Sequence, residues 1–132
     1  NIDMTGVVIG KDIACCTSEK SLVHYINYMG KEVGFPIVAK QGVYSSDSTP
    51  FADHGVPAVS FARLSPKGGA EIHSRKDVLD FLSADIYYKT CEFVISFAQR
   101  MLDSIYFPVE QTIPEEMKKE LDTYLGRTEK DK

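Results

Sequence analysis

The chain has 132 residues, of which 43% are hydrophobic and 26% charged, and its formal net charge is −4 at pH 7. This length fits one domain that can bury a real core, and the acidic balance argues against nucleic-acid binding, which needs a basic face. No run approaches the roughly 18 apolar residues of a membrane span. We therefore expect neither a nucleic acid nor a membrane as a partner.

The chain starts with an extended segment, a strand and a helix. Residues 11–18 are typical of a strand, and residues 18–34 carry apolar side chains at helical spacing. Ser18 is the predicted N-cap of this helix, and Gly34 is its predicted C-terminal stop. Residues 35–41 form a second strand candidate.

The three cysteines, Cys15, Cys16 and Cys91, do not form a disulfide framework, because their number is odd and two are adjacent. In a strand, Cys15 and Cys16 would point to opposite faces. We expect small buried thiols in a reducing compartment, which slightly favours the cytoplasm. A catalytic cysteine is the alternative.

A short helix is predicted within residues 45–55. Asp47 or Ser48 can cap it, Pro50 suits its first turn and Gly55 ends it. A histidine at the C-terminal end of such a helix, as at position 54, is explained by the helix dipole.

A strand over residues 56–62 and a polar loop over residues 63–82 come next. Ser83 is the predicted N-cap of the longest element, a helix over residues 83–104. The apolar stripe predicted on this helix consists of Tyr87, Cys91, Val94, Ile95, Ala98, Met101 and Leu102.

The last predicted helix covers residues 112–126, with Pro114 and acidic residues first and Gly126 last. Residues 127–132 are predicted to be a disordered polar tail. Strands that alternate with helices predict an α/β fold, in which a sheet is covered by helices on its faces. We expect one domain over residues 1–126.

Three side chains at strand ends or loops are candidates for chemistry, because functional residues of such folds gather there. Asp3 lies in an apolar extended segment, where a buried carboxylate needs a partner or a metal, although a turn cap or a lysine partner would also explain it. Asp47 is explained by helix capping alone. His73 carries an imidazole, the commonest metal ligand, although a lone loop histidine is more often incidental. Local motifs alone leave the function open.

Three segments in order carry a resemblance to a known family. They are NIDMTG at residues 1–6, SDSTPFADHGVPAVSF at residues 46–61 and IHSRKDVLD at residues 72–80. Together they resemble the C-terminal half of the co-catalytic zinc aminopeptidases (metallopeptidase family twenty-eight), to which the glutaminyl cyclases are related. The resemblance extends to about residue 104. It implies a three-layer sandwich whose mixed sheet is covered by helices, with only the C-terminal portion of that fold present here.

The resemblance also implies roles for the three candidates. Asp3 would ligate one zinc ion and His73 the second, while Asp47 would lie at the rim of the active site, behind the ligands or on the substrate side. Ser48 stands where the family commonly has histidine, and Ile72 stands where it often has tyrosine or tryptophan. These departures, with Ser45 and Ser46 where some members have an arginine just before the serine–aspartate pair, bear on the substrate rather than on the metals.

The family's remaining ligands, a histidine, a bridging aspartate and a glutamate, precede the segment that supplies Asp3, and so does its general base. We therefore expect this chain to be a C-terminal fragment of a longer enzyme that releases N-terminal residues from peptides with a free N-terminus. The complete enzyme would hold two zinc ions, whereas the isolated chain is expected to be inactive and need not bind any. The metal could also be cobalt or manganese.

Two alternatives remain open. The chain could be a non-catalytic α/β binding module derived from this family, or part of an acyl transferase similar to the glutaminyl cyclases. If the upstream half is missing, the chain would expose a sheet edge, which favours pairing with a second copy and so a homodimer.

Overall fold

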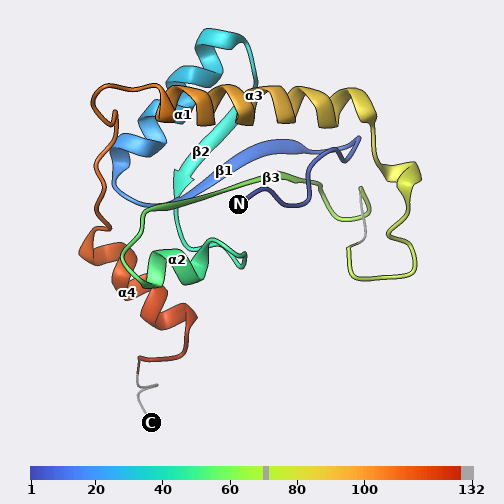
Figure 1. The fold of residues 1–132 in the computed structure, drawn as a ribbon. Coiled ribbons are helices and arrows are strands. Elements are labelled where there is room, and N and C mark those ends of the chain that lie inside the picture. Colours follow the sequence, from blue (N-terminus) through green and yellow to red (C-terminus); the bar gives the residue numbers. More distant parts are fainter. Residues whose placement is uncertain (70–71, 129–132) are drawn as a thin grey trace.

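The computed structural model describes residues 1–69 and 72–128, which contain a mixed three-stranded sheet and four α-helices (Figure 1). The central strand β1 (Lys11–Thr17) pairs in parallel with β2 (Ile37–Gln41) and antiparallel with β3 (Ala58–Leu64). The predicted α/β class is therefore confirmed.

The helices lie on both sides of the sheet. Helices α1 (Lys20–Val33) and α3 (Ala84–Leu102) cover one face, and α2 (Thr49–Asp53) and α4 (Glu115–Tyr124) lie together on the other side (Figure 1). A 3₁₀ helix at Leu79–Phe81 interrupts the region predicted to be a loop. None of the helices in the described part of the chain is long and apolar enough to cross a membrane.

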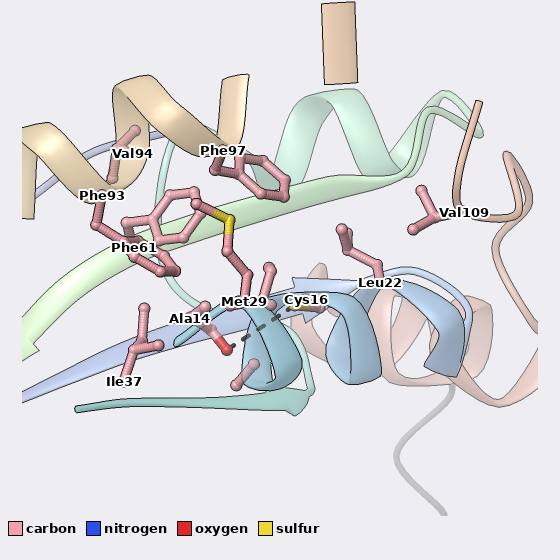
Figure 2. Close-up of a cluster of buried hydrophobic side chains, with 12 residues drawn as sticks. Ala14, Cys16, Leu22, Met29, Ile37, Phe61, Phe93, Val94, Phe97 and Val109 are labelled. Carbon is pink, nitrogen blue, oxygen red and sulfur yellow. Dashed lines mark hydrogen bonds between the residues drawn. The ribbon is translucent and has the colours of Figure 1, made fainter. Parts of the chain in front are cut away.

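The main core lies between the sheet and the pair α1 and α3. Figure 2 shows Phe61 of β3 and Phe93 and Phe97 of α3 close to Met29 of α1. The Phe61 ring meets the Phe93 and Phe97 rings edge-on, with centroids 6.3 and 5.4 Å apart. Large aromatic side chains bury most area per residue, so this aromatic group dominates the core. A smaller cluster on the other side consists of Ala52, Ile113, Met117 and Leu121.

The stripe predicted on α3 is shifted by about one residue position, which is about 100° of rotation, although its members Val94 and Met101 do pack into the main core. The residues that α3 buries are Thr90, Phe93, Val94 and Phe97. Tyr87, Ile95 and Leu102, which the pattern places in the stripe, are 48%, 57% and 83% exposed. Apolar residues occur on both sides of this helix, so periodicity alone could not choose between two neighbouring faces.

The helix ends agree with the sequence in part. Gly34 ends α1 with a left-handed φ of 71°, and the Ser83 hydroxyl at the start of α3 accepts the N–H of Ile86, as predicted. The prediction of Ser18 as an N-cap is wrong: the N-cap is Glu19, and the Ser18 hydroxyl donates to the Glu19 carbonyl at 3.0 Å. The Ser18 hydroxyl bonds to a neighbouring backbone carbonyl, and this local hydrogen bond competes with capping of the helix.

Candidate functional site

Asp3 lies in a segment that runs beside the outer edge of β3. Its N–H donates to the Phe61 carbonyl at 3.0 Å, and the Phe61 N–H donates to the Asn1 carbonyl at 2.9 Å. These bonds form one isolated parallel bridge, between Ile2 and Phe61. The Asp3 side chain is exposed, so the expectation of a buried carboxylate that needs a partner is wrong.

Asp47 lies next to the same segment. The Tyr44 hydroxyl donates to the Met4 sulfur at 3.9 Å, and burial, followed by the Asp3 carboxylate, raises the pKa of Tyr44. Burial lowers the pKa of the Asn1 amine, and the Asp47 carboxylate opposes this effect. These interactions bring the exposed Asp3 and Asp47 to one edge of the sheet.

The residue after Asp47 belongs to a ring of three hydroxyls. The oxygens of Ser46, Ser48 and Ser60 lie 2.6–2.8 Å from one another, and Ser48 and Ser60 are 5% and 0% exposed. Ser48 is the N-cap residue of α2, but its side chain makes no capping bond. Ser48 therefore takes the predicted N-cap position, but without the capping hydrogen bond, because its hydroxyl has partners inside the protein.

Replacing Ser48 with histidine, the residue common in the resembled family, is expected to lower the free energy of unfolding by about 1–3 kcal/mol, because the imidazole must enlarge a closely packed site. Urea unfolding followed by circular dichroism measures the change. Ser45→His, at an exposed neighbour, is the matched control and should have a smaller effect. Equal stability of the two variants would show that position 48 has room for a larger side chain.

Helix α4 braces the segment that carries Asp47. The Val43 N–H donates to the Glu120 carboxylate at 3.0 Å, and the Tyr124 hydroxyl donates to the Ser45 hydroxyl at 2.9 Å. The sequence pattern predicted no such contact for α4. No local signal could have found these bonds, because their partners lie far apart in the chain.

The start of the predicted tail also reaches this region. The Arg127 guanidinium pairs with both carboxylate oxygens of Asp53 at 2.5 and 2.8 Å, and this hydrogen bonding lowers the pKa of Asp53. Residues 129–132 of the predicted disordered tail lie outside the described residues, as do residues 70 and 71 of the loop that leads to His73.

His73 is an exposed residue in the loop after β3. Its φ is 58°, and among the described residues the other non-glycine residue with a positive φ is Met4, at 52°. Side chains disfavour this conformation, and such residues cluster at functional sites. Met4 lies in the segment NIDMTG and His73 in the segment IHSRKDVLD.

The position of His54 at the C-terminal end of α2 is as the sequence predicted. It is the C-cap residue of α2, and its Nδ1 lies 2.9 Å from the Pro50 carbonyl oxygen. Among the described residues, no group of three or more histidine, cysteine, aspartate or glutamate side chains could hold a metal ion.

Burial makes the two adjacent cysteines poor nucleophiles. Both are buried and free; Cys16 lies in the main core, whereas the Cys15 thiol donates to the Gly42 carbonyl at 3.4 Å. Burial raises the pKa of Cys15, and it raises the pKa of Cys16 to about 12. Since the thiolate is the reactive form, these values argue against the catalytic-cysteine alternative.

Alkylation at pH 8 is expected to modify Cys91 first, because it is only half-buried, while a pKa of about 12 leaves about 10⁻⁴ of Cys16 as thiolate. Peptide mass spectrometry after timed treatment with iodoacetamide measures the order. In urea all three thiols should react at similar rates. A native Cys16 that reacts as fast as Cys91 would contradict the assigned burial.

A buried ion pair was not predicted from the sequence. Asp12 of β1 is 3% exposed and pairs with Arg63, which lies directly opposite it on β3. The Thr90 hydroxyl of α3 donates to the second carboxylate oxygen at 3.2 Å. The one signal in the sequence was a charged residue near the start of one apolar strand and another near the end of a second, which predicts a cross-strand pair only once the antiparallel register is known.

Comparison of the chain with protein-family models, with curated proteins and with solved structures finds no match. The structure itself defines a small α/β protein with a mixed sheet.

Proposed function

We propose that this chain is the C-terminal part of a zinc-dependent aminopeptidase, in which Asp3 and His73 each ligate one of two zinc ions. The observation that carries the proposal is the arrangement around β3. Asp3 and Asp47 share its outer edge, and His73 lies in the loop that follows it. The positive φ of Met4 and of His73 adds support, because strain of this kind is retained where function requires it.

The chemistry of these side chains suits the metal. A carboxylate oxygen and an imidazole nitrogen are both zinc donors, and a catalytic zinc ion usually has three protein ligands. The other ligands and the general base would come from residues outside this chain, so the isolated chain is expected to be inactive. A bound zinc ion lowers the pKa of its water to about 7, which supplies a hydroxide nucleophile at neutral pH. Asp47, an exposed carboxylate at the same edge, is suited to hold the ammonium group of a peptide substrate.

The test uses the native protein that contains this chain, isolated with an antibody raised against it. Its intact mass reveals any residues before Asn1, elemental analysis measures its zinc, and aminoacyl-coumarin substrates measure release of N-terminal residues. We expect zinc and an activity that EDTA removes. The variants Asp3→Asn and His73→Gln should each lose zinc and activity, whereas His54→Gln, the matched histidine control, should retain both.

The first alternative is a non-catalytic α/β binding module. It predicts that the native protein holds no zinc and releases no amino acids. The alternative related to glutaminyl cyclases predicts cyclisation of N-terminal glutamine by the same zinc-containing protein. Either result would overturn the aminopeptidase proposal.

A further inference from the structure

A cavity of about 670 Å³ opens between the C-terminal end of α1, helix α3 and the sheet. Sites for small molecules typically measure about 300–1,000 Å³ and are mostly apolar, with a few polar groups that fix the ligand's orientation. The apolar residues that line this cavity are Met29, Val33, Phe35, Pro36, Ile86 and Phe93. Two of them, Phe35 and Phe93, stack with ring centroids 4.7 Å apart, so part of the wall is rigid.

The polar lining includes the buried pair of Asp12 and Arg63. Both carboxylate oxygens of Asp12 already accept hydrogen bonds, from Arg63 and from Thr90. The Asp12 side chain is 4% exposed, whereas the Arg63 side chain is 14% exposed. Of the two side chains, Arg63 is the more accessible, and the Asp12 carboxylate has no oxygen without a hydrogen-bond donor.

The guanidinium of Arg63 has more N–H donors than its bonds within the protein use. It carries five N–H groups. One goes to Asp12, Nε donates to the Val7 carbonyl at 2.7 Å and Nη2 donates to the Val8 carbonyl at 3.5 Å. Among the residues that the structure describes, the other two N–H groups have no hydrogen-bond acceptor, and the three bonds hold the guanidinium in place before any ligand arrives. Lys89 and Glu92 also line the cavity, and Lys89 forms an exposed ion pair with Asp85.

We propose that this cavity binds a small monocarboxylate with an apolar body, such as a medium-chain fatty acid, whose carboxylate accepts hydrogen bonds from Arg63. Arginine forms strong charge-assisted hydrogen bonds to carboxylates, and the prearranged guanidinium reduces the cost of ordering. A neutral apolar ligand would cover the two spare N–H groups without bonding them, which is unfavourable. An ammonium ligand offers only hydrogen-bond donors, so it could not bond the spare N–H groups either. The inference does not depend on the proposed function.

The test titrates this chain, labelled with ¹⁵N, with octanoate and follows its amide resonances. A ligand of this size should bind with a dissociation constant of roughly 0.1–5 mM, and the shifts should centre on Gly34, Ile86 and Phe93. Octan-1-ol and octylammonium, which have the same chain, should bind at least about tenfold more weakly, the factor that the loss of one good polar contact causes. Comparable binding of either control, shifts centred elsewhere or no binding of octanoate would overturn the proposal.

A variant pair separates occupancy of the cavity from general effects of charge. Val33 lines the cavity and is 48% exposed, whereas Tyr28, on the same helix and 68% exposed, is not among the lining residues. Val33→Glu places a negative charge at the cavity and should weaken octanoate binding by about tenfold or more, whereas Tyr28→Glu should leave it unchanged. Equal affinity of the two variants would overturn the proposal. Both positions are exposed enough for the fold to tolerate the change, which the amide spectra without ligand verify.

Discussion

Replacing Arg63 with methionine is expected to lower the free energy of unfolding by about 3–5 kcal/mol, which is the range for removing one partner of a buried ion pair. Asp12 is 3% exposed, so the variant would leave a carboxylate in the interior with Thr90 as its remaining side-chain donor. Methionine preserves much of the volume of the arginine stem, so the loss reports chiefly on the charge. Urea unfolding followed by far-UV circular dichroism measures it.

Two further variants interpret this result. Asp12→Asn combined with Arg63→Met removes both charges and should recover part of the loss, because no uncompensated charge remains. Lys89→Met breaks an ion pair with Asp85 whose side chains are 62% and 73% exposed, and it should change stability little. If Arg63→Met proves no more harmful than Lys89→Met, the Asp12 carboxylate is not buried as the structure has it.

Replacing Phe93 with alanine is expected to cost about 3–5 kcal/mol, the range for truncating a buried phenylalanine. Its ring stacks on Phe35 and meets Phe61 edge-on. Both rings are held by the rest of the core, so neither can easily move into the cavity that the substitution leaves. The same unfolding measurement applies.

The matched control for Phe93→Ala is Ile95→Ala on the same helix. Ile95 is 57% exposed, and surface substitutions usually stay within about 0.5 kcal/mol. The sequence pattern predicts the reverse order, because it places Ile95 in the buried stripe. A greater loss of stability for Ile95→Ala than for Phe93→Ala would therefore support the buried face of α3 that the sequence pattern predicts and contradict the structure.

Features with local causes could be predicted from the sequence. Gly34 adopts the left-handed conformation that ends α1, and Ser83 caps α3, because each depends on residues within one helical turn. The alternation of strands and helices likewise predicted the α/β class. Ser18 shows the limit of such reasoning, since its hydroxyl donates to the neighbouring Glu19 carbonyl and does not cap the helix.

The candidate site also combines features that the sequence predicted with features that only the tertiary structure shows. The identities of Asp3, Asp47 and His73 as candidates came from the sequence and its resemblance, and their metal and substrate roles remain proposals. That the segments of Asp3 and Asp47 lie beside each other depends on hydrogen bonds between the first residues and β3, which are separated by about half the chain. The positive φ of Met4 and His73 is set by surroundings that no pattern of residues predicts.

By itself, then, the sequence determined the element types, most of their ends, and the residues that carry a resemblance to zinc aminopeptidases. The tertiary structure alone decided the buried face of α3, the serine ring and the pairing of Asp12 with Arg63. The physical reason is range: capping and periodicity act over a few residues, whereas burial and charge pairing depend on which distant segments share the low-dielectric interior, where an unpaired charge is costly.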